Sequence, residues 1–185
     1  LYSMLNALED MIPIKKTDVN ESISRLMDTK KKISSTNLTG SNTALSLAEW
    51  ISELPIIYYP WGLHSAAIRF KNSLQENAKT HAFAEDVIES SHNAIVAWEK
   101  RSKIKPILII GKDDYAKTKE RWQVVKEFFE LNKIEYKEIH SSDGSILTKL
   151  VNLIYLLDYS SIYRAVLSKT DPTPVKPIEF IKSRI

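Results

Sequence analysis

The sequence contains no cysteine. It can therefore form no disulfide, offers no thiolate nucleophile and holds no cysteine-ligated metal. A chain without disulfides suits a reducing compartment, and we expect a cytoplasmic protein. Long apolar runs are also missing, since the longest, at residues 151–157, is interrupted by Asn152 and stops at Asp158. A membrane span needs roughly 20 apolar residues, so we expect no membrane partner.

A concentrated positive charge is absent as well. The chain has 26 Lys and Arg against 23 Asp and Glu, a formal net charge of +3. Nucleic acid attracts proteins with a dense basic patch, so it is a poor candidate partner. With 185 residues, 43% of them hydrophobic, the chain can form one domain with a core, or a domain with an appended segment. Because it begins at Leu1 without a signal-peptide pattern, we interpret its start as a fragment boundary.

The first 52 residues carry apolar side chains at helical spacing. The three stripes are Leu1, Leu5 and Leu8; Ile23, Leu26 and Met27 after an Asn20 cap; and Ala44, Leu45, Ala48 and Ile51 after Thr43. A polar loop at residues 34–42 separates the last two. Its hydroxyls and backbone amides could bind phosphate, but a surface connector that leads into a helix cap is the favoured interpretation.

From residue 54 onward the pattern changes to short β-type runs separated by helical stretches. Strands are predicted at residues 56–59, 106–110 and 134–139. The second run is continuously apolar, which is typical of a central strand covered on both faces. Alternation of this kind predicts βαβ units and a parallel sheet. We therefore predict a three-layer α/β fold, with a helical connecting segment at 1–52 ahead of a domain at 53–185.

Four helices are expected in this second part. Apolar faces define one from about residue 62 to 79, one around Trp122, a long one that opens near Ser142, and a short terminal one capped by Thr173. The residues expected to be buried in the first two are Leu63, Ala66, Ala67, Phe70 and Leu74, then Trp122, Val125 and Phe129. A third apolar face, on the long helix, contains Leu147, Leu150, Val151, Ile154 and Leu157.

The first of these helices has a polar face that could carry chemistry. Its members are Arg69, Asn72, Ser73, Glu76 and Lys79, whose spacing places them on one side of the helix. A carboxylate such as Glu76, near the helix end, could serve as a general base. An ordinary solvated face is the more common meaning of such a pattern, so the helix alone leaves both interpretations open.

Two further segments have polar character. His92 lies in residues 89–93, ahead of a helical stretch, and a histidine in a loop beside a carboxylate-bearing helix could relay protons. Residues 171–175 contain two prolines and are typical of a turn before a helix. The sequence has no pair of histidines at metal-ligand spacing and no glycine-rich nucleotide motif, so neither a metal site nor a dinucleotide site is indicated.

Taken in order, these segments resemble the bifunctional phosphoglucose/phosphomannose isomerases of archaea and some bacteria, members of the sugar isomerase (SIS) superfamily. The matching segments are residues 69–79, which end in Glu-Asn-Ala-Lys, residues 89–93 and residues 171–175, followed by Lys182. Residues 42–48 and 60–63, on either side of the first strand, agree with the same family. The similarity covers nearly the whole chain.

The resemblance implies an SIS-type α/β/α domain and roles for three residues. Glu76 corresponds to the catalytic base that moves a proton between C2 and C1 of the sugar. His92 corresponds to the histidine that assists ring opening, and Lys182 to a lysine that contacts the substrate near its ring oxygen. In the family this histidine comes from the neighbouring subunit, which implies a homodimer. No metal or organic cofactor is implied.

The chain departs from the family pattern in two ways. Ile88 stands where the family often has proline, which should alter loop stiffness more than chemistry. The family's first SIS half, which supplies the Ser/Thr-rich phosphate loop and an arginine that stabilises the enediolate, is missing. We expect this half, and its phosphate-binding residues, upstream of residue 1.

The implied function is aldose–ketose isomerisation of glucose 6-phosphate and mannose 6-phosphate to fructose 6-phosphate, through a cis-enediolate. We expect this fragment to be inactive alone. One alternative is a non-catalytic SIS-type module that senses a sugar phosphate, and another is a structural and dimerisation remnant. A regulator would ordinarily carry a DNA-binding domain and would not need Glu76, His92 and Lys182 together.

Overall fold

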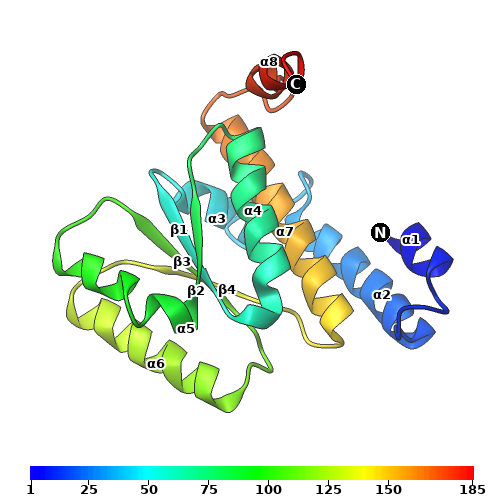
Figure 1. The fold of residues 1–185 in the computed structure, drawn as a ribbon, viewed down its shortest axis with the longest axis horizontal. Helices are drawn as coiled ribbons and strands as arrows, with labels where there is room; N and C mark the ends of the chain where they lie inside the picture. Colours follow the sequence, from blue (N-terminus) through cyan, green and yellow to red (C-terminus); the bar gives the residue numbers. More distant parts are fainter.

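The computed structural model describes all residues, 1–185. Its centre is a four-stranded sheet in which every neighbouring pair of strands is parallel. The strands are β1 (Pro55–Tyr59), β2 (Phe83–Asp86), β3 (Lys105–Ile110) and β4 (Lys137–His140), in the order β2-β1-β3-β4. Helices cover the sheet on both faces (Figure 1). The predicted three-layer α/β/α architecture is therefore confirmed.

The two faces of the sheet are built from alternate residues of the central strands, as strand geometry requires. Ile57 and Ile107 point to one face, and Ile56 and Leu108 to the other. The first face is covered by α3 (Thr43–Trp50), α4 (His64–Asn77) and α7 (Ile146–Leu167), and the second by α5 (Val87–Ser90), the 3₁₀-helix η2 (Ala94–Glu99) and α6 (Ala116–Leu131). Each face thus has its own hydrophobic core.

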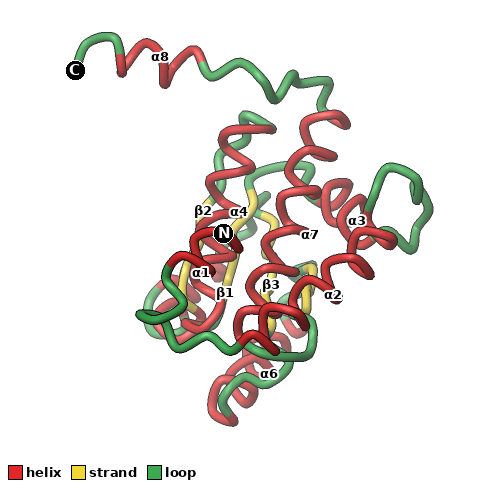
Figure 2. Tube along the Cα trace, turned by 90° about the vertical axis from the view of Figure 1, so that its right-hand side faces the viewer, coloured by secondary structure: helices red, strands yellow, loops and turns green.

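The remaining elements lie around this centre. They are α1 (Tyr2–Ala7), α2 (Lys16–Ile33), the 3₁₀-helix η1 (Trp61–Leu63) and α8 (Lys176–Lys182). Figure 2 shows α2 and α3 beside α7, whereas α8 lies on a chain that leads away from the body. None of the helices is both long and apolar enough to span a membrane. The proposed division at residue 53 stays a prediction. Leu47 of α3 and Ile51, which follows this helix, both belong to the hydrophobic core on one face of the sheet.

The apolar helix faces are confirmed for α4 and α6, whose predicted residues are all buried. On α7 the prediction is confirmed in part. Leu157 is buried, and Leu150 and Ile154 pack against the core, whereas Leu147 and Val151 are only half-buried. Small polar residues such as Ser160 are also buried on this helix. Packing of α7 against both α2 and α4 favours small side chains that can hydrogen-bond across the contact. Asn152, for example, accepts a 2.7 Å hydrogen bond from Thr29 of α2.

Several boundaries also differ from the prediction. The edge strand β2 was not predicted, because its Phe-Ala-Glu-Asp sequence lacks an apolar run, and Phe83 is half-exposed. The predicted strand at 134–139 forms regular pairs only from Lys137. Helix α2 begins at Lys16 rather than after Asn20, and it leaves Ile23 and Met27 exposed. Local patterns alone do not fix such ends.

The loop before α3 is the surface connector that was favoured over a phosphate loop. Its hydroxyls bond mainly to one another, as between Thr39 and Ser41 at 2.8 Å. Asn42 is buried, and its side chain accepts a 3.0 Å hydrogen bond from the Leu45 amide, so it caps α3. Its amide group also donates to the Ile33 carbonyl at 3.1 Å. The cap therefore joins α2 to α3.

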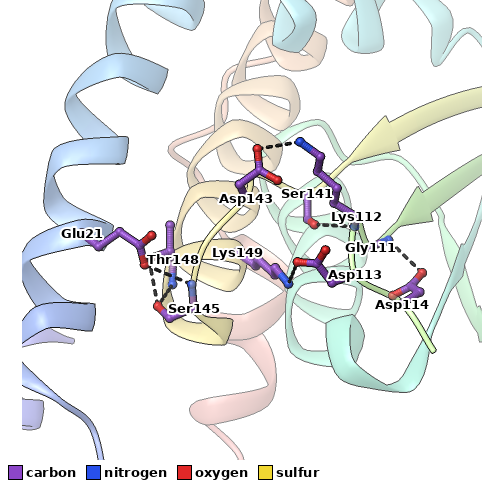
Figure 3. Close-up of polar contacts among 10 residues, drawn as sticks. All are labelled: Glu21, Gly111, Lys112, Asp113, Asp114, Ser141, Asp143, Ser145, Thr148 and Lys149. Carbon is purple, nitrogen blue, oxygen red and sulfur yellow. Dashed lines mark hydrogen bonds and ion pairs between the residues drawn. The ribbon is translucent and has the colours of Figure 1, made fainter.

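Glu21 fastens α2 to the start of α7 (Figure 3). Its Oε2 accepts hydrogen bonds from the Ser145 amide at 3.0 Å and the Thr148 hydroxyl at 2.8 Å. Gly144 has φ of 112°, and a Cβ there would lie 2.6 Å from Glu21 Oε1. Only glycine fits both the backbone conformation and the close approach of this carboxylate.

We expect Glu21→Gln to destabilise the fold at neutral pH, with a smaller effect in acid. The hydrogen bond from the Ser145 amide, followed by that from Thr148, holds the pKa of Glu21 below its ordinary value of 4.5. A carboxyl group with a lowered pKa stabilises the fold at pH values above its unfolded-state pKa. This stabilisation is lost as the pH falls through its folded-state pKa. Urea denaturation of the wild-type protein and of Glu21→Gln, at pH 7 and at pH 3, measures the difference in their free energy of unfolding. Asp28→Asn, on the exposed side of α2, is the control. A gap between Glu21→Gln and wild type that does not narrow in acid would contradict the prediction.

Candidate functional site

A groove of about 1510 Å³ runs along α4 and α7, below the loop that leads into α3. Asn72 and Glu76 of α4 line one wall, and Tyr155 and Tyr159 of α7 line the other. The Glu76 side chain is exposed and makes no hydrogen bond or ion pair within the chain. Its carboxylate is therefore free to meet a ligand in the groove.

Two other residues of the predicted polar face hold α4 against α7. The Arg69 guanidinium donates to both Asp158 oxygens, with its shortest contact at 2.7 Å, and the Ser73 hydroxyl donates to the same carboxylate at 3.0 Å. This hydrogen bonding raises the pKa of Arg69. Farther along, the Asn77 amide donates to the Ser161 hydroxyl at 2.8 Å. Arg69 and Ser73 thus position the helix that carries Glu76.

Lys79 joins two of the sequence motifs. Its backbone has φ of 54°, in the left-handed region, just after the end of α4. From there the ammonium donates to the Glu76 carbonyl at 2.6 Å and to the Pro174 carbonyl at 2.7 Å, with a longer contact to Pro172 at 3.4 Å. The Glu-Asn-Ala-Lys segment and the proline-rich segment therefore meet at one point, although Lys79 and Pro172 are 93 residues apart in the chain.

The terminal helix α8 differs from the prediction at its start. Thr173 does not cap it; the Thr173 amide instead donates to Asp171 Oδ1 at 2.9 Å, which closes a turn, and the helix begins at Lys176. No residue of α8 is buried. Lys182 is exposed, and α8 lies near the end of α4 in Figure 1. Lys182 is not among the residues that line the groove, although the segment before α8 is bonded to Lys79 just after α4.

His92 lies at the other end of the strands. Helix α4 runs back from the carboxyl end of β1, so Glu76 lies near the amino ends of the strands, where β2 begins. His92 follows the carboxyl end of β2, in the turn between α5 and η2. Beside it, Asn93 donates to Glu89 at 2.8 Å and also caps η2, which fixes the turn. Within one chain, therefore, Glu76 and His92 do not share a site, and His92 is not among the residues that line the groove.

This domain matches a known protein family. Residues 40–185 match the model of the bacterial phospho-glucose isomerase C-terminal SIS domain. The chain belongs to this family. The matched region of the SIS domain includes α4, the His92 turn and the proline-rich segment, so all three motifs lie inside it.

Curated relatives of this SIS domain are bifunctional phosphoglucose/phosphomannose isomerases. The one from Caldicellulosiruptor bescii is 33% identical over 146 residues, covering 76% of this chain and 43% of the relative. That from Aquifex aeolicus is 27% identical over 186 residues, covering 98% and 56%. The chain thus spans about half the length of the curated relatives it matches.

Solved structures agree on the fold. A glucose-6-phosphate isomerase like protein from Thermus thermophilus superposes with a TM-score of 0.70 at 16% identity, over 91% of this chain and 56% of that one. Tagatose-6-phosphate ketose/aldose isomerase from Escherichia coli gives a TM-score of 0.62 at 12% identity, over 92% and 50%. At these identities the likeness shows a shared SIS architecture.

Sequence reasoning missed the tyrosines of the groove in this SIS domain. Tyr155, Tyr159 and Tyr163 form a ladder along α7, with neighbouring ring centroids 5.1 and 5.9 Å apart. The hydrogen bond with Tyr159, together with burial, raises the pKa of Tyr155 to about 12. Their spacing of four residues was a usable signal, since such residues lie on one helix face. No three His, Asp or Glu side chains come together as a metal site would require.

Proposed function

We propose that this SIS domain is the C-terminal part of an aldose–ketose isomerase that interconverts glucose 6-phosphate and mannose 6-phosphate with fructose 6-phosphate. The family and the curated relatives support a phosphosugar isomerase. The observation that carries the residue assignment is the free Glu76 carboxylate, exposed in the groove on a helix that Arg69 and Ser73 hold in place.

The proposed chemistry needs a positioned base and a positive charge. Glu76 takes the C2 proton of the open-chain aldose, and electrons move into the C1 carbonyl to form a cis-enediolate. The hydroxyl proton of O2 passes to O1, and the proton held by Glu76 returns at C1 to give the ketose. Glucose and mannose phosphates differ only at C2, so one base and one planar intermediate serve both. No metal or organic cofactor is needed in this scheme.

The positive charge that stabilises the enediolate comes, in this proposal, from an arginine outside residues 1–185. Arg69 is not available for this role, because both oxygens of Asp158 already occupy its guanidinium. The phosphate-binding loop is assigned to the same missing half. Lys182 then approaches the ring oxygen of the substrate when α8 packs beside the groove.

We propose a homodimer, and the positions of Glu76 and His92 support it. If His92 assists ring opening at the site that holds Glu76, a histidine from a second copy must do so, since the two residues of one chain lie at opposite ends of the strands. Two-fold symmetry then gives two equivalent sites, each with the base of one copy and the histidine of the other. The cytoplasmic location stays a prediction.

We expect residues 1–185 alone to show only background isomerase activity, because this proposal assigns the phosphate-binding loop and the enediolate-stabilising arginine to the other half of the protein. Co-expression with the preceding half of the protein should restore turnover of fructose 6-phosphate. A coupled assay that detects glucose 6-phosphate measures both. Robust turnover by residues 1–185 alone would show that the site is complete within this chain and would overturn the two-half assignment.

A further inference from the structure

A second cavity lies at the carboxyl edge of the sheet, between the ends of β1 and β3. The chain leaves β1 toward β2 on one side, and it leaves β3 toward β4 on the other. The loops after the two strands therefore diverge, which opens the type of crevice where α/β proteins bind ligands. A cavity of about 300 Å³ occupies this position, lined by residues 60–63, the loop after β3 and the start of α7. Its size is at the lower end of the range for small-molecule sites.

The walls of this cavity are unusually apolar for a surface. Trp61 is 79% exposed and Tyr115 74%, and Ile146 is also exposed. Trp61 does not project loosely: its ring stacks on His64, with centroids 5.6 Å apart at 26°, and His64 packs edge-on against Tyr59 at 5.4 Å. The Trp61 ring is therefore held in place, and most of it is not covered by any other part of this chain.

The floor of the cavity is polar and fixed. Asp114 Oδ2 accepts hydrogen bonds from the Gly111 amide at 2.9 Å and from Trp122 Nε1 at 3.2 Å (Figure 3 shows the first). A Cβ at position 111 would lie 2.0 Å from Asp114 Oδ1, so only glycine allows the carboxylate to sit there. Burial raises the pKa of Asp114. Oδ1 makes no hydrogen bond within the chain and remains an acceptor for a ligand.

The charge of the lining excludes some ligands. The one cation that lines the cavity, Lys149, is paired with Asp113 at 2.7 Å. Next to it, Lys112 is paired with Asp143 at 2.6 Å, which ties the loops after β3 and β4 together (Figure 3). The lining contains two carboxylates and a single ammonium, which is already paired, so binding of a phosphate dianion is disfavoured. They suit hydroxyl groups, which donate hydrogen bonds to carboxylates.

We propose that this cavity binds a neutral monosaccharide, whose ring lies on the Trp61 indole while its hydroxyls donate to Asp114 Oδ1 and Asp113. The aromatic face covers the apolar C–H side of the ring, and the carboxylates orient it. The proposal does not depend on the proposed isomerase function. This cavity shares no lining residue with the groove, and Glu76 lies at the far end of α4 from Trp61. Its ligand carries no phosphate, unlike the substrates proposed for the groove.

The test uses the full-length protein labelled with 5-fluorotryptophan and observed by ¹⁹F NMR. The Trp61 signal is assigned as the one that Trp61→Phe removes. Addition of glucose, mannose or fructose should shift this signal in a saturable way, with Kd on the order of 1 mM. Inorganic phosphate should not. Asp114→Asn should weaken the affinity about tenfold or more, because a charged acceptor is lost. Glu76→Gln should leave the sugar response unchanged, even if it abolishes isomerase activity.

Three results would overturn the proposal. One is a Trp61 signal that does not move up to 100 mM sugar, a level about 100 times the expected Kd. Another is an Asp114→Asn variant with wild-type sugar affinity. The third is a Trp61 signal that responds to protein concentration and not to sugar, which would assign the aromatic wall to an interface between copies. Unchanged near-ultraviolet circular dichroism confirms that each variant is folded.

Discussion

Glu76→Gln in the full-length protein is expected to lower kcat for the isomerisation of fructose 6-phosphate by about 10²- to 10⁴-fold, the usual contribution of a general base. Glutamine keeps the size and shape of the side chain but cannot accept the C2 proton. Because the side chain makes no hydrogen bond in the chain, its replacement should leave the groove and the fold intact. KM should therefore change little compared with kcat.

The measurement is a coupled assay run with fructose 6-phosphate and, separately, with mannose 6-phosphate. Both activities should fall together, since one base serves both sugars. Glu127→Gln is the matched control, because it makes the same chemical change on the exposed side of α6, across the sheet. If Glu76→Gln keeps wild-type turnover, the base lies elsewhere. If it loses only one of the two activities, the single planar intermediate is wrong.

Mixing two inactive variants is expected to restore activity. His92→Gln alone should lower turnover by about 10²-fold, through loss of general acid–base help in ring opening. In a mixed dimer of Glu76→Gln and His92→Gln, one of the two shared sites receives both an intact Glu76 and an intact His92. With random pairing, half of the dimers are mixed, so about a quarter of the wild-type activity should return.

The experiment uses differently tagged copies, so that the mixed dimer can be purified and counted. The double variant, with both substitutions in one chain, is the control; when mixed with wild type it should give no recovery beyond the wild-type sites that remain. Mixed dimers that form but stay inactive would show that Glu76 and His92 do not act at a site shared between two copies. A protein that stays monomeric at assay concentration would exclude the shared site altogether.

Much of the fold could be predicted from local patterns. Strand β3 is continuously apolar and covered on both faces, so its sequence alone indicated a central position. The buried faces of α4 and α6 followed from the 3.6-residue period. Strand β2 could not be predicted, because an edge strand with Phe83 half-exposed and two carboxylates shows no such pattern. Its pairing with β1 exists only because α4 returns the chain to that edge.

The candidate site was less predictable than the fold. The pattern on α4 placed five polar residues on one face and indicated Glu76 as a possible general base. It could not show that Arg69 and Ser73 hold the helix on α7 while Glu76 stays free. The resemblance to the isomerase family singled out Glu76, His92 and Lys182. The ladder of tyrosines was missed although its spacing of four residues along α7 could have revealed it. The cavity beside Trp61 could not be predicted, because it depends on which segments become neighbours.

The sequence by itself determined the layered α/β class, the central strands and the family, because burial periodicity and ordered motifs are local properties of a chain. Only the tertiary structure decided which of these segments meet. It joined Lys79 to the carbonyls of Pro172 and Pro174, and it placed Glu76 and His92 at opposite ends of the strands. The physical reason is that proximity follows from strand order and from the direction in which each helix returns, and neither can be read from spacing along the chain.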